Sequence, residues 1–206
     1  MNGGKGKPAV LIGKRVRLRL IEERDAPGLF ELYSDQEVMR YWNHAPWTTP
    51  EQAGRAVEEA RSEHASGISL HYVIEHLSTK KLIGSCALYA VDQENRCAAL
   101  GYLLAKSCWG QGYLSEAMQR FLAYAFTQLA LDSIHADIHP GNAASAKALT
   151  RLGFRQDRDR RASWLVGGAR CATASYRLTR RDWQLERAAH ANVLTDALLD
   201  QSQAQR

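Results

Sequence analysis

Two glycines separated by one residue could form a phosphate-binding turn in this chain. Gly110 and Gly112 follow the apolar run of residues 100–105, and a long amphipathic pattern begins directly after them. The first N–H groups of a helix have no partner within the helix, and the helix dipole adds about half a positive charge there. A glycine turn at a helix start can therefore hold a pyrophosphate through backbone N–H groups alone.

Two common nucleotide-binding motifs do not fit this turn. A P-loop needs Lys and then Ser or Thr directly after its last glycine, where this chain has Tyr113 and Leu114. A dinucleotide-binding fingerprint needs a third glycine at position 115, which is Ser115. An ordinary turn remains the simpler alternative, but the apolar strand before it and the helix after it favour a phosphate site.

A second segment combines a strand pattern with a short helix. Residues 134–138 alternate between apolar and polar side chains, and the pair Pro140-Gly141 ends this run. Asn142 is a good helix N-cap, and Gly153 would end the helix that follows. The same order of strand, turn and helix thus occurs twice.

These segments resemble the cofactor-binding motifs of the GNAT N-acetyltransferases. The likeness is closest to the branch of the ribosomal-protein N-terminal acetyltransferases RimJ and RimL. GYLL followed by WGQGYLSEA is similar to one motif of that branch, and NAASAKALTRLGF is similar to the other. The early run EERDAPGLFELYSDQEVMRYWNHAPWTTPEQA is similar to its N-terminal helices. The resemblance covers about residues 10–184.

The resemblance implies transfer of an acetyl group from acetyl-CoA to an amine, by direct attack in a ternary complex and with no metal. Two neighbouring parallel strands, 97–105 and 134–138, would separate, and the pantetheine arm would pair with free backbone groups around Leu103, Leu104 and Ala105. A backbone N–H there could also stabilise the oxyanion of the reaction. The residues expected to hold the pyrophosphate are Trp109, Gly110, Gln111, Gly112, Tyr113, Leu114 and Ser115.

The resemblance also assigns two side chains. Asn142 matches an asparagine that contacts the pantetheine arm, a role compatible with N-capping. Ser145 matches a serine near the leaving sulfur, where it could act as the general acid that protonates the thiolate; a plain helix-surface hydroxyl is the alternative. Many other members of the superfamily have a tyrosine acid where this chain has Leu149, which gives Ser145 more weight.

The general base is unknown. Ala99 and Leu100 stand where the branch often carries an acid, and Arg170, Cys171 and Ala172 stand at the other common position. The remaining candidates, each of which has a structural or surface role as its simpler interpretation, are His71, Glu75, Asp92, His135, Asp137 and His139. A peptide α-amine has a pKa near 8 and needs less help than a lysine amine near 10.4.

That difference favours a protein or peptide N-terminal α-amine as the acceptor. A small-molecule amine such as a polyamine, an antibiotic or a metabolite is the alternative, as is a catalytically weak CoA-binding regulator. The aromatic side chains that could line the acceptor entrance are Tyr33, Tyr41, Trp42 and Trp47, although such residues more often belong to the core. Basic residues after Phe154 hint at an acidic acceptor or acyl group, although a solvated face is the simpler explanation.

The elements predicted to position these residues form an α+β pattern. Strands are expected at 14–21, 70–76, 82–91, 97–105, 134–138, 153–165 and 171–178, and helices at 24–34, 50–66, 112–130 and 142–151. With the resemblance, this predicts a GNAT fold: a mixed, mostly antiparallel sheet of six to seven strands, splayed at a central parallel pair and flanked by about four helices. We expect a flexible N-terminus over 1–9, one acetyltransferase domain over 10–184, and a helical, polar tail over 185–206 whose other role would be a homodimer contact.

Composition agrees with one cytoplasmic domain. The 206 residues are 45% hydrophobic, enough for one core, and no apolar run approaches the length of a membrane span or a signal peptide. The four cysteines form no metal or disulfide pattern; Cys108, beside the glycine turn, could be a reactive thiol, but a partly buried structural cysteine is the simpler interpretation. The net charge of +5 would suit RNA, but the basic clusters lack interleaved aromatics, so we expect nucleic-acid contact only through a ribosome.

Overall fold

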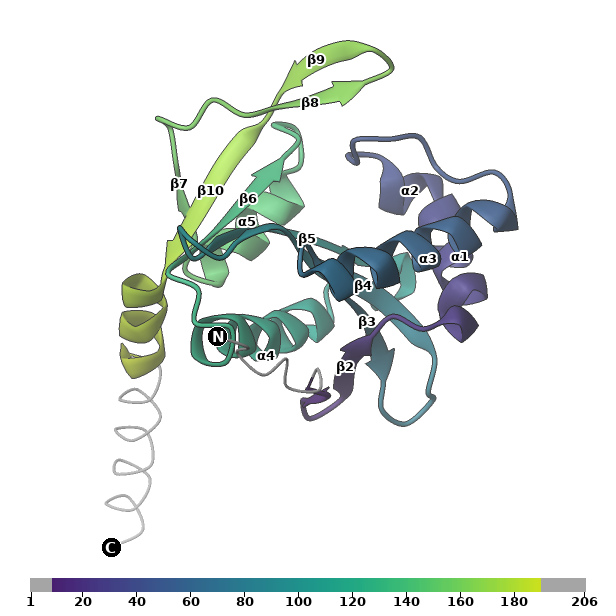
Figure 1. Cartoon of the computed structure of the whole chain (residues 1–206), viewed down its shortest axis with the longest axis horizontal. Coiled ribbons are helices and arrows are strands. Elements are labelled where there is room, and N and C mark those ends of the chain that lie inside the picture. Colours follow the sequence, from purple (N-terminus) through teal and green to yellow (C-terminus); the bar gives the residue numbers. More distant parts are fainter. Residues whose placement is uncertain (1–8, 190–206) are drawn as a thin grey trace, which may run out of the picture.

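An eight-stranded mixed sheet forms the centre of the molecule (Figure 1). The structure is a computed structural model that describes residues 9–189. In spatial order the strands are β1 (Leu11–Ile12), β2 (Val16–Leu20), β3 (Leu70–His76), β4 (Leu82–Asp92), β5 (Cys97–Leu104), β6 (Ser133–Ile138), β10 (Ala174–Thr179) and β7 (Arg155–Gln156). Neighbouring strands are antiparallel except β5 and β6, which are parallel.

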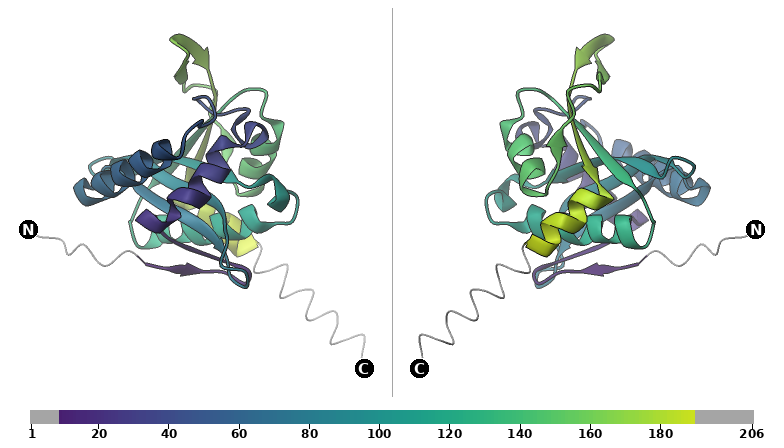
Figure 2. Two further views of the ribbon diagram at one scale, coloured as in Figure 1. Left: turned by 90° about the vertical axis from the view of Figure 1, so that its right-hand side faces the viewer. Right: turned by 90° about the vertical axis from the view of Figure 1, so that its left-hand side faces the viewer.

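Helices cover both faces of the sheet. The helices and single turns are η1 (Glu23–Asp25), α1 (Ala26–Ser34), α2 (Gln36–Met39), α3 (Pro50–Ser66), η2 (Lys106–Cys108), α4 (Tyr113–Thr127) and α5 (Ala143–Arg151). Residues 180–189 are also helical. Helices α1 and α3 contact β4 and β3 on one face, while α4 and α5 contribute to the core on the other (Figures 1 and 2).

Strand β3 shows how the sequence builds these two layers. Successive side chains of a strand point to opposite faces, so Tyr72 and Val73 enter different clusters. Tyr72 meets Phe121 of α4 at a ring-centroid distance of 5.3 Å, whereas Val73 packs with Leu29 of α1 and Val57 of α3. All five residues are fully or almost fully buried. Burial on both faces explains the nearly continuous apolar character of this strand.

The predicted parallel pair separates, as expected for the GNAT fold. Strands β5 and β6 are paired only over residues 97–99 and 133–135, with Ala99 opposite His135 as the last pair. Beyond that point β5 stays paired with β4, and β6 stays paired with β10. A wedge-shaped gap therefore opens between the two strands at their carboxyl ends.

The sequence-based prediction was wrong about the first of the two closing strands, while the second, predicted over 171–178, corresponds largely to β10 (Ala174–Thr179). Instead of one strand over 153–165, the chain forms the two-residue β7 and then a separate hairpin, β8 (Ser163–Val166) with β9 (Ala169–Ala172). The hairpin turn contains Gly167 and Gly168, both at positive φ, which glycine adopts without steric cost. The hairpin projects beyond the body of the molecule (Figures 1 and 2). Short β1, β7 and α2 also raise the number of elements above the prediction.

The end of the described chain packs against the core. Trp183 lies 5.2 Å from Phe126 of α4, between ring centroids, and the helix over 180–189 runs through the expected boundary at residue 184. The predicted N-terminus over 1–9 and tail over 185–206 lie almost wholly outside the described residues. Within residues 9–189, no helix is both long and apolar enough to cross a membrane, and no group of His, Cys, Asp or Glu side chains is arranged to hold a metal ion.

Candidate active site

The glycine turn and the first turn of α4 form a nest of unbonded backbone donors. Gly110 and Gly112 have φ values of +72° and +81°, which explains the need for glycine at both positions. None of the N–H groups of residues 110–115 donates to another group in the described chain, and the first bond of the helix is made by the Glu116 N–H to the Gly112 carbonyl, at 3.1 Å. Such a run of N–H groups at a helix N-terminus is an anion site.

A guanidinium that sequence reasoning missed lies at this loop. Arg15, just before β2, donates from Nη1 to the Gln111 carbonyl at 3.0 Å and from Nε to Glu116 Oε2 at 3.0 Å. Its Cζ lies 4.4 Å from the centroid of the Tyr113 ring. The side chain is about half exposed, so the charge stays accessible to a ligand. The only sequence signal was a basic run around residues 14–19, which did not point to the loop.

Glu116 would repel an anion at the same helix end if it were free. Burial acts to raise its pKa, but hydrogen bonds from the Arg15 backbone N–H and guanidinium, and from the Val16 N–H, hold that pKa below its ordinary value. The carboxylate is therefore ionised, and its charge is matched by Arg15. The pair fixes the start of β2 against the loop and leaves the N–H nest open.

Backbone N–H and C=O groups of alternate residues of β5 face the gap between β5 and β6, and the sequence alone could not show which residues these are. The Ala105 N–H donates to the Ile83 carbonyl at 2.8 Å, so it is engaged with β4 rather than free. Backbone groups of successive residues in an antiparallel strand point to opposite sides, so Tyr102 and Leu104 direct theirs toward the gap, whereas Leu103 faces β4. The Trp109 indole N–H already bonds the Leu104 carbonyl, at 2.8 Å.

Helix α5 begins at the edge of the same gap. Asn142 Oδ1 accepts the Ser145 N–H at 3.0 Å, which confirms the predicted N-cap. Ser145 Oγ lies 2.7 Å from the hydroxyl of Tyr102, which comes from β5. Burial raises the pKa of Tyr102 to about 12 against the opposing effect of the Ser145 hydrogen bond, so this hydroxyl is protonated at neutral pH. Leu149 is fully buried in the core.

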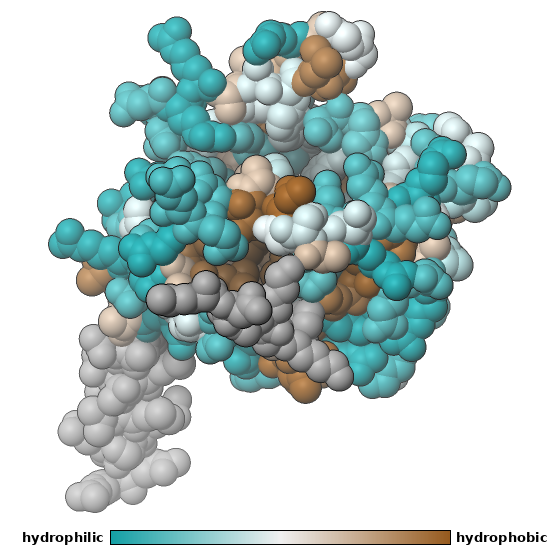
Figure 3. All heavy atoms as spheres, in the orientation of Figure 1, coloured by the Kyte–Doolittle hydropathy of each residue, from teal (hydrophilic) through white to brown (hydrophobic). Residues whose placement is uncertain are grey.

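A cavity of about 350 Å³ lies on the other face of the sheet, between α1, α3 and strands β3 to β5. Three of the four predicted aromatic residues line it: Tyr33, Trp42 and Trp47. Tyr33 stacks on Trp47 with centroids 4.4 Å apart, and its hydroxyl bonds Ser85 Oγ at 3.1 Å. Tyr41 instead contacts the His139 ring. On the face of the molecule that Figure 3 shows, the surface is mostly hydrophilic and some hydrophobic side chains gather near its centre.

The structure separates the six candidates for a general base. Glu75 is bonded to Arg17 and Arg19, Asp92 accepts from Asn95, and His139 accepts from the Gly141 N–H. Asp137 accepts from Ser175 Oγ at 2.6 Å and pairs with Arg160, while burial and then the charges of Arg160 and Arg177 lower the pKa of His135. Of the six candidates, His71 is the one that lines the cavity, with Nε2 lying 3.2 Å from Glu63 Oε2.

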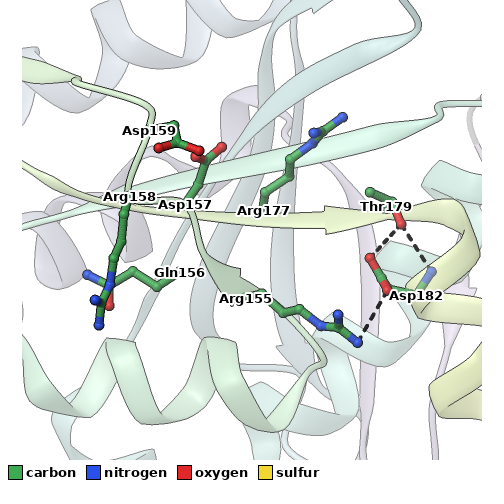
Figure 4. Close-up of a pocket in the computed structure, with 8 residues that line it drawn as sticks. All are labelled: Arg155, Gln156, Asp157, Arg158, Asp159, Arg177, Thr179 and Asp182. Atoms are coloured by element: carbon green, nitrogen blue, oxygen red, sulfur yellow. Dashed lines mark hydrogen bonds and ion pairs between the residues drawn. The ribbon is translucent and has the colours of Figure 1, made fainter.

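A second hollow, of about 400 Å³, lies at the β7 edge of the sheet (Figure 4). Of its charged residues, Arg155 pairs with Asp182 at 3.4 Å, and Asp182 also accepts a hydrogen bond from Thr179 Oγ1 at 2.6 Å. Strands β6 and β10 separate β7 from the gap. This position makes the hollow a poor acceptor site, which weakens the hint that the basic cluster attracts an acidic substrate.

A backbone anion nest beside a separated parallel pair can hold a phosphate-bearing molecule with an extended arm. Comparison with known proteins gives the family: the family model described as an acetyltransferase (GNAT) domain matches residues 15–155. The uncharacterized N-acetyltransferase p20 of Bacillus licheniformis is 36% identical over 147 residues, which cover 71% of this chain and 83% of p20. The chain belongs to the GNAT acetyltransferases, and its activity is that of an acyltransferase.

A further relative supports the RimJ/RimL-like branch, and the solved structure of RimL shares the fold. YdaF of Bacillus subtilis, provisionally named a ribosomal N-acetyltransferase, is 27% identical over 182 residues, covering 85% of this chain and 97% of YdaF. The structure of RimL, the ribosomal L7/L12 α-N-protein acetyltransferase, in complex with CoA has a TM-score of 0.71 at 19% identity, covering 83% of this chain and 98% of RimL.

One similar fold belongs to a protein with a different acceptor. The spermidine N-acetyltransferase of Vibrio cholerae, solved with CoA and spermine, has a TM-score of 0.71 at 20% identity, covering 82% of this chain and 98% of that one. At this identity the likeness shows the fold alone.

Proposed function

We propose that this protein is an acetyl-CoA-dependent N-acetyltransferase that acylates a primary amine by direct attack while both substrates are bound. The observation that carries the proposal is the run of unbonded N–H groups at residues 110–115, placed beside the gap between β5 and β6. A diphosphate and an extended amide arm need these two features together, because one binds anions and the other offers strand-like pairing.

The described residues suit each part of CoA. The N–H groups of residues 110–115 and the Arg15 guanidinium would hold the pyrophosphate. The inward backbone groups of Tyr102 and Leu104 would pair with the pantetheine arm, and the Asn142 side-chain NH₂, whose oxygen already caps α5, would donate to it. The exposed Trp109 ring, fixed by its bond to Leu104, would form one side of the entrance.

The chemistry then follows from the Tyr102 and Ser145 pair. The neutral amine attacks the thioester carbonyl, a C–N bond forms, and the tetrahedral oxyanion accepts a hydrogen bond from a backbone N–H that faces the gap. The C–S bond then breaks, and the thiolate takes a proton from the hydroxyl pair. The proton that the amine nitrogen loses restores the pair through solvent. The net products are an N-acetyl amide and free CoA.

A peptide N-terminal α-amine is the acceptor that we favour, because the relative YdaF carries a ribosomal name, as does RimL, whose fold is similar. The absence of an unpaired carboxylate among the six base candidates also favours an amine that is partly neutral at pH 7. A small-molecule amine is the second candidate. It is supported by the aromatic-lined cavity between α1, α3 and strands β3 to β5, and by the similar fold of the spermidine enzyme.

A thioester-consumption screen tests the proposal. Acetyl-CoA, propionyl-CoA and succinyl-CoA are each offered with N-terminal peptides and with small amines, and release of free CoA is followed. We expect release with acetyl-CoA that depends on the acceptor. Lack of CoA binding at millimolar concentration, or lack of transfer to every amine, would contradict the proposed function.

A further inference from the structure

The floor of the acceptor cavity is a row of small residues that leads from the reaction gap to a histidine. His71 is opposite Ala87 in the β3–β4 pair, and Ala87 is opposite Gly101 in the β4–β5 pair. These three residues point to the same face and all line the cavity. Because neighbouring strands lie about 4.8 Å apart, the row spans about 10 Å. The residue between Gly101 and His71 in this row is Ala87, whose side chain is a single methyl group.

The roof and sides of this channel are aromatic. Trp42 lies over the gap end, since its ring would be 3.6 Å from a Cβ placed on Gly101, and Tyr89 would be 3.4 Å from the same point. The stacked Tyr33 and Trp47 rings and the His44 ring complete the lining, with His44 parallel to Tyr33 at 6.2 Å. Aromatic faces attract ammonium groups when water is excluded from between them.

The far end of the channel is acidic. Glu59 and Glu63, both on α3, line it beside His71, and Glu63 also accepts a hydrogen bond from Ser69 Oγ. No lysine or arginine lines this cavity in the described part of the chain, although the protein as a whole has a net charge of +5. The cavity therefore carries negative charge, although the whole chain has a net positive charge. Negative charge inside a cavity attracts a cationic ligand.

From this lining we infer that the acceptor carries a second protonated nitrogen, held by Glu59 and Glu63 under the aromatic roof while its reacting amine lies over Gly101. This inference rests on the proposed function and specifies its substrate: a primary amine joined by a short flexible chain to another cation. Two sources supply that chemistry, a free diamine or a peptide whose second residue is basic. A polyamine was one of several acceptors left open by the resemblance, and the cavity lining adds the requirement for a second cation.

Paired acceptors of matched size test the inference. Cadaverine is compared with pentylamine, and a peptide with lysine at its second position is compared with the same peptide carrying norleucine there. In at least one pair we expect kcat/KM to be about tenfold higher for the member with the extra charge, as for one charge-assisted contact. The pair that shows the preference identifies the source.

Variants then assign the preference to this cavity. Glu59→Gln combined with Glu63→Gln keeps the size and hydrogen-bonding ability of both side chains and should reduce the preference to about twofold, mainly through KM. Glu58→Gln, next along α3 and absent from the lining, is the matched control and should keep the preference.

Two results would overturn the inference while leaving the proposed function intact: equal kcat/KM within both pairs, or an equal loss for charged and uncharged acceptors in the double variant. Absence of acetyl transfer to any amine would instead contradict the proposed function, and the inference with it.

Discussion

The Tyr102 hydroxyl lies 2.7 Å from Ser145 Oγ and joins strand β5 to helix α5 across the mouth of the gap. Two hydroxyls at this distance share one hydrogen bond, so one can donate outward while the other donates to it. We propose that the pair supplies a proton at the point where the parallel strands separate. Sequence reasoning identified Ser145 but not its partner.

Removing either hydroxyl should slow the chemical step more than it weakens CoA binding. We expect Ser145→Ala and Tyr102→Phe each to lower kcat by about 100-fold, the lower range for loss of a positioned acid, with little change in the Kd for CoA. The double variant should be little worse than either single variant, because the two groups act as a unit. Steady-state kinetics and calorimetric CoA binding check this; an equal loss in kcat and in affinity would exclude the acid role.

The pH dependence follows from the raised pKa of Tyr102. Because that pKa is about 12, the hydroxyl keeps its proton throughout the neutral and mildly alkaline range. The rate should therefore rise as the acceptor amine becomes neutral and then stay level up to about pH 10. A kcat profile in which activity falls between pH 8 and about 10 without unfolding would contradict this assignment.

Adding a single methyl group to the glycine turn should weaken CoA binding at the backbone N–H groups of residues 110–115. Gly112→Ala places a Cβ 3.3 Å from Arg15 Nη2 and strains a residue whose φ is +81°. We expect the Kd for CoA to rise at least about tenfold, because the loop N–H groups can no longer converge. Gly67→Ala is the matched control: Gly67 has a φ of +79° with open space around it, at the end of α3. That change should cost about 1 kcal/mol of stability and leave CoA affinity unchanged.

Gly101 has no conformational reason to be glycine, which marks it as a site of close approach. Its φ is not positive, and an added Cβ would meet only ordinary contacts. We expect Gly101→Ala to keep the fold and the affinity for CoA but to raise the KM for the amine several-fold, because the methyl group enters the acceptor channel. Thermal melting and acceptor titrations measure the two effects. If the KM for the amine did not change, the acceptor amine would bind away from Gly101.

A buried ion network predicts acid sensitivity of the fold. Burial acts to raise the pKa of Glu75, whose side chain is 4% exposed, but bonds from Arg17 and Arg19 outweigh it and hold the pKa below 4.5. A carboxylate whose pKa is lower in the folded than in the unfolded protein stabilises the fold at pH values above its ordinary pKa. That stabilisation is lost as the pH falls through the lower, folded-state pKa. Glu75→Gln should therefore destabilise by about 3 kcal/mol at pH 7 and by much less near pH 3.

Urea unfolding at the two pH values, with Glu58→Gln as an exposed control, measures this difference. A destabilisation that does not change with pH would mean that packing around Glu75, and not its charge, supports the sheet.

Local patterns predicted the parts of this protein that depend on short stretches of chain. The periodicity around Phe121 gives α4, and the N-cap at Asn142 gives the start of α5. Arg15 and Tyr102 act across 96 and 43 residues of sequence, so spacing alone could not pair them with Gln111 and Ser145. The sequence did contain one indication for Tyr102. It lies between Leu100 and Leu104 on one face of the strand, and a hydroxyl among buried apolar side chains needs a hydrogen-bonding partner.

The acidic end of the acceptor channel was hidden for a similar reason. Glu59 and Glu63 read as ordinary polar residues of an amphipathic helix, and only the packing of α3 on β3 brings them beside His71. The strand predicted over 153–165 was wrong because the chain leaves the sheet after Gln156 and forms no strand again until Ser163, where the separate hairpin begins.

One quench experiment tests the central claim most directly. The protein is mixed with acetyl-CoA, with and without a saturating primary amine, and free CoA, acetylated amine and intact protein mass are measured in the same samples. Direct attack in a ternary complex predicts that CoA is released only when amine is present, in equal amount to the N-acetyl product, and that the mass of the protein stays unchanged. Release of CoA without amine, an acetylated protein intermediate, or bound acetyl-CoA that never yields an acetylated amine would contradict it.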